Sequence, residues 1–165
     1  KSSKGTKVAP VICYESIYGE YVSDYVRNGA NLLAIITNDG WWNNSEGHKQ
    51  HLSYARLRSI ETRKNIVRSA NTGISSVINY KGEVVKTIGY ELEGLINYKV
   101  GVNNKITFYT LYGDYIYRIC LFFMILISAF YLANLLKVKK WVFNYFFNKL
   151  LYKKIKKLFL QKIYF

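Results

Sequence analysis

A long charge-free run near the C-terminal end, Ile119–Leu136, most constrains what this chain can fold into. It holds 18 residues without a charged side chain, and Arg118 stands directly before it. A helix over Tyr115–Leu136 would be about 33 Å long at 1.5 Å per residue, which is enough to cross the hydrocarbon core of a bilayer. The core helix of a small domain is rarely so long and so uniformly apolar. The sequence therefore predicts one transmembrane helix at residues 114–136.

The chain beyond Leu136 is strongly basic. It carries nine lysines and no acidic residue, so it supplies nine of the 14 net positive charges. These lysines alternate with leucine, isoleucine and aromatic residues, which is typical of an amphipathic helix at a membrane interface. Nucleic acid is the competing partner for such a segment. A tail beside a membrane span already lies at a lipid surface, so residues 137–165 are predicted to meet lipid headgroups and no nucleic acid.

The charge distribution also predicts an orientation. By the positive-inside rule, the lysines after Leu136 place residues 137–165 in the cytoplasm. Residues 1–113 then lie on the opposite side, on the periplasmic face of a bacterial inner membrane.

The chain before the apolar run has the pattern of an α/β protein. Val8–Cys13 and Leu32–Thr37 are apolar runs typical of buried strands, and Ile17–Val26 between them has its apolar residues on one helical face. Strand, helix and strand within about thirty residues form a βαβ unit. Further segments are predicted as follows: a helix at His48–Asn65, strands at Ile66–Ala70, Ile74–Tyr80, Glu83–Ile88 and Leu95–Val100, and a linker at Asn103–Gly113.

The first strand ends at a cysteine. Cys13 is followed by a polar, helix-compatible segment, which predicts a sharp turn that lifts the thiol off the end of the sheet. The free N–H groups and the dipole of a helix start favour the thiolate, and the thiolate is the nucleophilic form. These residues alone also fit a cysteine that is simply a small buried hydrophobe.

The loop after the second strand and the helix after it hold the other candidates. Asn38–Gly47 contains Trp41 and Trp42, which fit either a local hydrophobic lid or the wall of a pocket off the carboxyl end of a parallel strand. His48 and His51 lie three residues apart, but no third metal ligand is evident, so packing or capping is the favoured interpretation. Glu61 is expected to pair with neighbouring arginines. No metal and no cofactor is expected.

Several blocks, in order and at similar spacing, resemble the apolipoprotein N-acyltransferases, whose nitrilase-like domain precedes their last membrane helix. Each block alone is weak, but the ordered set is specific. The blocks are Pro10-Val11-Ile12-Cys13-Tyr14-Glu15, Thr37-Asn38-Asp39-Gly40-Trp41, Gln50-His51 with Ala55-Arg56-Arg58-Glu61, Arg68-Ser69-Ala70-Asn71-Thr72-Gly73, Tyr80-Lys81-Gly82-Glu83 and Thr107–Gly113.

This resemblance implies a fold and a chemistry. Residues 1–113 would be the C-terminal half of a nitrilase-like α-β-β-α sandwich, with Cys13 as the nucleophile of a Glu-Lys-Cys triad. Cys13 would take a fatty acyl chain from a phospholipid as a thioester and pass it to the N-terminal diacylglyceryl-cysteine of an apolipoprotein. Tyr14 and Glu15 would orient the site, and Trp41 matches an aromatic residue beside the acyl pocket.

The sequence also departs from the family pattern. The family's glutamate and lysine lie well upstream of the cysteine, so they are expected in an upstream half of the same enzyme; Lys7 and Glu15 do not match them. Trp42-Asn43 replaces a usual aromatic-glycine pair. Two other functions stay open: a membrane-tethered nitrilase-type amidase, and a degenerate, non-catalytic membrane-anchored binding module.

Overall fold

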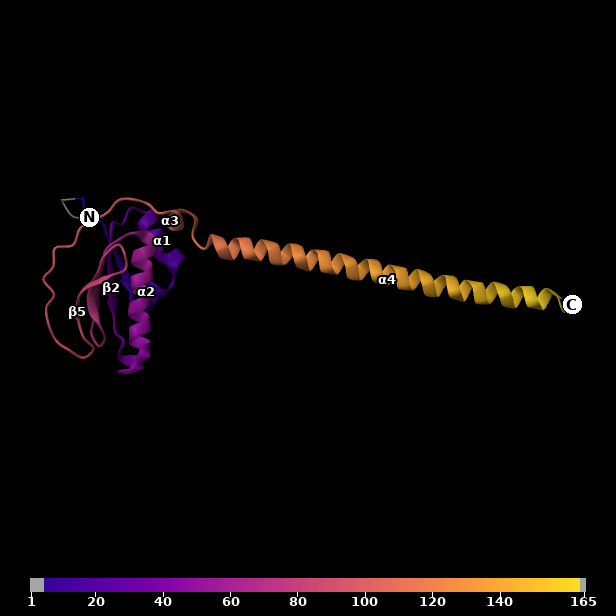
Figure 1. Cartoon of the computed structure of the whole chain (residues 1–165), viewed down its shortest axis with the longest axis horizontal. Coiled ribbons are helices and arrows are strands. Elements are labelled where there is room, and N and C mark those ends of the chain that lie inside the picture. Colours follow the sequence, from indigo (N-terminus) through magenta and orange to yellow (C-terminus); the bar gives the residue numbers. More distant parts are fainter. Residues whose placement is uncertain (1–4, 164–165) are drawn as a thin grey trace. The chain divides into compact units, whose positions relative to one another are not determined.

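The computed structural model describes residues 5–163, apart from the side chains of Val142 and of residues 154–163. The chain divides into two compact units, one that ends at Tyr115 and one that begins at Ile116. The first unit is an α/β domain and the second is a single helix (Figure 1).

The α/β domain is built on a five-stranded mixed sheet. Its strands follow the order of the sequence, and the first three are parallel while the last two run antiparallel to their neighbours. The predicted βαβ unit is confirmed, because α1 (Gly19–Arg27) joins the two parallel strands β1 and β2. The strands are β1 (Val8–Ile12), β2 (Leu32–Thr37), β3 (Ile66–Ala70), β4 (Ser75–Ile78) and β5 (Val84–Ile88).

Two helices cover one face of the sheet, α1 and α2 (Glu46–Thr62) (Figure 1). Successive side chains of a strand point to opposite faces, so alternate apolar residues of each strand meet the helices. Burying one such side chain contributes about 1.5–3 kcal/mol. The core is formed by Ala9, Val11, Leu33, Ile35, Ile66 and Ile78 of the sheet with Val22, Val26 and Ala55 of the helices.

The segment after β5 differs from its prediction. Leu95–Val100 forms no strand in the described chain, and residues 89–107 have no helix or strand. A strand needs a neighbouring strand to complete its backbone hydrogen bonds. Here the Lys86 side chain of β5, and not a backbone N–H, donates a hydrogen bond to the Asn97 carbonyl oxygen.

The expected linker at Asn103–Gly113 is also partly wrong. It contains a short helix, α3 (Phe108–Tyr112), whose N-cap Thr107 accepts a hydrogen bond from Thr110 N at 3.0 Å. The segment before α3 is held by the buried Lys64 ammonium, which donates hydrogen bonds to the carbonyl oxygens of Asn103 and Lys105.

The second unit is one long helix, α4 (Tyr115–Ile163). By length and composition, its stretch Tyr115–Lys153 could cross a membrane. The most apolar 18 residues of this stretch are not buried within the structure. No break separates the apolar run from the basic residues at Leu136, because the same helix continues through both. About 20 helical residues span a hydrocarbon core, so this helix is longer than a membrane requires.

Candidate active site

Cys13 begins a sharp turn directly after β1. It is the first residue of a short 3-10 helix, η1 (Cys13–Ile17), and its φ is +50°. A residue with a side chain is uncommon in this left-handed region, and such strained positions gather at active sites. The predicted turn from strand to helix is therefore present. The expected α-helix start is not, because α1 begins only at Gly19, and five residues of 3-10 helix align few peptide dipoles.

Glu15 fixes the backbone on the strand side of Cys13. Its Oε2 accepts a hydrogen bond from the Ile12 backbone N–H at 2.7 Å, and its Oε1 accepts one from the Tyr21 hydroxyl at 3.0 Å. Both carboxylate oxygens are thus engaged at the turn. Glu15 therefore holds the backbone directly before Cys13.

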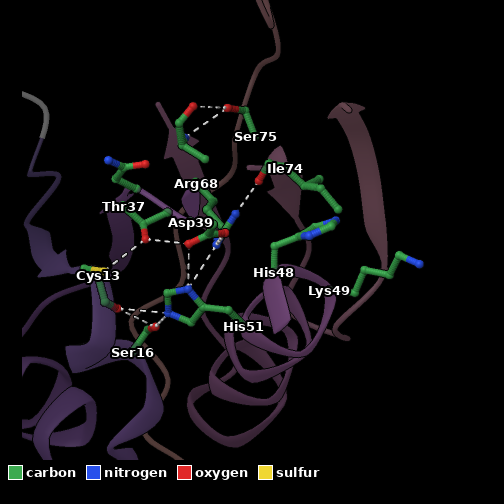
Figure 2. A network of polar contacts seen from close by, with 12 residues as sticks. Cys13, Ser16, Thr37, Asp39, His48, Lys49, His51, Arg68, Ile74 and Ser75 are labelled. Atoms are coloured by element: carbon green, nitrogen blue, oxygen red, sulfur yellow. Dashed lines mark hydrogen bonds and ion pairs between the residues drawn. The ribbon is translucent and has the colours of Figure 1, made fainter. Parts of the chain in front are cut away.

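A buried cluster of polar side chains lies behind Cys13 (Figure 2). At its centre is Asp39, two residues beyond the end of β2 and fully buried. Its Oδ1 accepts from the Thr37 hydroxyl at 2.9 Å and from His51 Nδ1 at 2.8 Å, and its Oδ2 accepts from Arg68 at 2.5 Å. Burial by itself would raise the pKa of Asp39, but these hydrogen bonds and the charge of Arg68 lower it to about 2. Asp39 is therefore a carboxylate at neutral pH.

The fold brings these residues together from three elements and the loop that holds Asp39. Thr37 ends β2, Arg68 sits in the adjacent strand β3, and His51 projects from α2. Gly73 closes the arrangement: its φ is +144°, and a Cβ there would lie 2.7 Å from Asp39 Oδ2. Glycine is needed at this position because the backbone approaches the carboxylate so closely.

Asp39, His51 and Ser16 are arranged like a Ser-His-Asp triad. His51 Nε2 lies 3.0 Å from Ser16 Oγ, as Nδ1 lies 2.8 Å from the carboxylate. Ser16 is fully buried, however, and its hydroxyl donates to the Cys13 carbonyl oxygen at 2.8 Å. A nucleophile must reach substrate, so this Ser16 is not one. Ser16 instead holds the Cys13 backbone through this hydrogen bond, and His51 Nε2 lies 3.2 Å from the same carbonyl oxygen.

Cys13 is a partly exposed residue, and its sulfur has a buried neighbour. Thr37 Oγ1 lies 3.2 Å from Sγ. Among the described side chains of residues 5–153, no carboxylate and no lysine ammonium is hydrogen-bonded to this sulfur. The described chain thus supplies a reachable thiol and a hydroxyl beside it.

The two tryptophans occupy different environments. Trp41 is 82% exposed, whereas Trp42 stacks on Tyr14 with ring centroids 5.9 Å apart and meets His51 edge-on at 5.5 Å. Gly47 makes room for this, because a Cβ there would lie 2.4 Å from Trp42. Sequence reasoning singled out Trp41, and the structure places Trp42 against the site.

The remaining candidates have packing roles. His48 lies under the ring of Tyr90, with centroids 4.5 Å apart, and its Nδ1 is 3.3 Å from Asn43 O. His48 thus has a packing role, whereas His51 belongs to the hydrogen-bond network of Asp39. Glu61 pairs with Arg58 at 3.2 Å, as expected, and burial raises the pKa of Glu61.

Sequence reasoning assigned no role to Thr37, Asp39 or Arg68. A signal for them was present: an arginine interrupts the apolar run of β3, and a carboxylate follows the end of the neighbouring strand. Parallel strands end at the same edge of a sheet, and a buried arginine needs an acidic partner.

Comparison with known proteins identifies the family. Residues 1–104 match the family model described as carbon-nitrogen hydrolase. The chain belongs to the carbon-nitrogen hydrolase family. The chain has a nitrilase-like α/β fold with a mixed sheet. A long apolar helix follows this domain.

Curated relatives carry the name apolipoprotein N-acyltransferase. The protein of Chlorobaculum tepidum is 36% identical over 121 residues, which cover 73% of this chain and 23% of that protein. The protein of Haemophilus influenzae is 34% identical over 127 residues, or 76% of this chain and 24% of that protein. The resemblance seen in the sequence is therefore confirmed, and the chain spans about a quarter of the length of these relatives.

Two solved structures match part of the chain. A carbon-nitrogen hydrolase from Helicobacter pylori G27 matches with a TM-score of 0.49 at 16% identity, over 55% of this chain and 39% of that one. An amidase from Nesterenkonia, in a form with acrylamide added at its active-site cysteine, matches with a TM-score of 0.45 at 19% identity, over 55% of this chain and 38% of that one.

Proposed function

We propose that this chain is part of an N-acyltransferase that moves a fatty acyl chain from a phospholipid, through a thioester at Cys13, to the N-terminal diacylglyceryl-cysteine of apolipoproteins. The observation that carries the proposal is the placement of Cys13 at the end of β1, as a partly exposed residue in a left-handed conformation. The named relatives supply the reaction class.

The reaction has two balanced steps. In the first, the Cys13 thiolate attacks the ester carbonyl carbon of the phospholipid, the C–S bond forms, and the C–O bond breaks. The lysophospholipid leaves with a proton from the protonated form of the general base, which acts here as the general acid. In the second, the free α-amine attacks the thioester carbon, the C–S bond breaks, the amine proton goes to the general base, and the thiolate returns. A thioester divides one difficult acyl transfer into two easier ones.

Other groups complete the site in this proposal. A glutamate acts as general base and a lysine stabilises the oxyanion together with a backbone N–H after Cys13. The glutamate and lysine come from the remainder of the enzyme, which the length of the relatives supports. Tyr14 and Glu15 orient the turn, and Trp41 lies toward the acyl chain. Neither step requires a cofactor or a metal.

The membrane placement is part of the proposal. Residues 1–113 form the catalytic part on the periplasmic side, residues 114–136 cross the bacterial inner membrane, and residues 137–165 lie at its cytoplasmic face. The apolar stretch of α4 and the exposed Lys137, Lys139 and Lys140 after it support this arrangement. A phospholipid donor and a lipid-modified acceptor both reside in the same membrane.

The test is Cys13→Ala in the full-length enzyme, reconstituted with phospholipid and an apolipoprotein. Transfer should be lost, and mass spectrometry of the Cys13 peptide should show an acyl thioester in the wild type alone. Cys120→Ala is the matched control and should leave transfer intact. Full transfer by Cys13→Ala would refute the assignment. Hydrolysis of small amides without acyl transfer would indicate the amidase, and a wild type that forms no acyl-enzyme would indicate a binding module.

A further inference from the structure

The Thr37 hydroxyl lies between two acceptors but has one proton. Its Oγ1 is 2.9 Å from Asp39 Oδ1 and 3.2 Å from Cys13 Sγ. Thr37 is 6% exposed, so bulk water does not supply a second donor to this point. The hydroxyl can therefore donate to only one of the two neighbours at a time.

Asp39 can release this donor without being left unpaired. As a carboxylate it only accepts hydrogen bonds. His51 Nδ1 at 2.8 Å and Arg68 at 2.5 Å remain on it when the hydroxyl turns away. When the Thr37 hydroxyl turns away, Asp39 thus loses one of these three hydrogen bonds but keeps its ion pair with Arg68.

We propose that Thr37 is a positioning residue whose hydroxyl proton alternates between Asp39 and the Cys13 sulfur with the charge on that sulfur. In the thiol, S–H donates to Thr37 Oγ1, which donates to Asp39. In the thiolate, the hydroxyl turns and donates to Sγ. When the sulfur carries an acyl group it is neutral, and the hydroxyl returns to Asp39. The thiol proton itself leaves to the general base, so no proton is transferred to Asp39.

This inference rests on the proposed role of Cys13 as the nucleophile, and it names what stabilises the thiolate within this chain. The short 3-10 helix offers little dipole, so a specific donor is needed. The Asp39–Arg68 pair and His51 surround Thr37 with hydrogen bonds to Asp39, and Ser16 holds the Cys13 carbonyl oxygen. In the described chain, the titratable or charged groups packed around the Cys13 turn are Tyr14, Glu15, Asp39, His51 and Arg68.

The experiment measures the rate of iodoacetamide alkylation of Cys13 against pH in the full-length enzyme, quantified by mass spectrometry of the Cys13 peptide. Thr37→Val replaces the hydroxyl with a methyl group of similar shape. We expect alkylation at pH 7 to slow about tenfold, equivalent to about 1.4 kcal/mol at 25 °C, while the rate at high pH stays the same. Thr37→Ser should restore the wild-type profile because it keeps the hydroxyl.

Thr62→Val is the matched control. Thr62 is also a fully buried threonine, and its hydroxyl donates to the Arg58 carbonyl oxygen, away from Cys13. Its alkylation profile should match the wild type. If Thr37→Val does not fold, Thr37→Ser and Thr37→Ala replace it, since both lack the methyl group and differ by the hydroxyl alone.

Two outcomes overturn the inference: an unchanged profile in folded Thr37→Val, or equal profiles for the serine and alanine variants. Acyl transfer is measured separately on the same preparations. A wild type without transfer but with a hydroxyl-dependent alkylation profile would refute the proposed function and leave the role of Thr37 intact.

Discussion

Removing the Asp39 carboxylate should be among the most destabilising single changes in the α/β domain. Asp39 and Arg68 are both almost fully excluded from solvent, at 0% and 3% exposure. Asp39→Ala leaves the Arg68 guanidinium buried without its counter-charge, and takes an acceptor from His51 and Thr37. Breaking a buried pair by removing one partner costs about 3–5 kcal/mol.

That cost is large against the total stability of a domain, which is about 5–15 kcal/mol. At a typical urea m-value of about 2 kcal/mol per M, the unfolding midpoint should fall by about 2 M. Pulse proteolysis of the full-length enzyme across a urea series would measure it, because cleavage reports the unfolded fraction of the domain.

The control uses the same substitution at an exposed pair. Asp24 pairs with Arg27 on α1, but its side chain is 63% exposed, and such pairs contribute about 0–1 kcal/mol. Asp24→Ala should barely move the midpoint. Replacing both buried charges, with Asp39→Leu and Arg68→Met, should recover much of the loss. Equal midpoints for Asp39→Ala and Asp24→Ala would show that the buried network does not stabilise the fold.

Two further predictions follow from charge. The pKa of Asp39 falls from 3.8 to about 2 on folding, so its stabilisation of about 2 kcal/mol is present above pH 4 and is lost as the pH falls toward 2. In Asp39→Asn the urea midpoint should not show this loss between pH 4 and pH 2. An identical loss in Asp39→Asn would contradict the assignment of the acid dependence to Asp39. The nine lysines beyond Leu136 predict a cytoplasmic C-terminus: a reporter fused after Phe165 should be active only in the cytoplasm and one near Lys81 only outside it, and the reverse pattern would overturn the proposed orientation.

The sequence predicted the sheet better than the site. The continuous apolar run Leu32–Thr37 marks a buried strand directly, and the structure has this strand and the predicted strand Ile66–Ala70 at the same bounds. Leu95–Val100 is also rich in strand-forming residues but forms no strand in the described chain. Pairing with a neighbour is a tertiary property, which residue type alone does not contain.

Sequence reasoning singled out Cys13 as the candidate nucleophile but none of the hydrogen bonds around Asp39. Cys13 is visible because a cysteine at the end of an apolar run is a local signal. The hydrogen bonds of Asp39 join residues up to 29 positions apart, and they depend on strand register and on the rotation of α2. Likewise, nothing local distinguishes Trp41 from Trp42; the contact of Trp42 with Tyr14 depends on the space left by Gly47.

The uncovered face of the sheet connects stability with the proposed chemistry. Val8, Ile12 and Ile36 are each at least half exposed there, and Ile12 pairs with Ile36 in the register of β1 and β2. An apolar sheet face must be buried against another layer to be stable in water, and α1 and α2 pack on the other face (Figure 1). We propose that the remainder of the enzyme supplies that layer, as a nitrilase-like sandwich requires. Cys13 directly follows Ile12, so a layer packed on this face ends next to the sulfur. The same packing that buries Ile12 would then bring the missing glutamate and lysine to Cys13, and assembly of the domain would switch on the nucleophile.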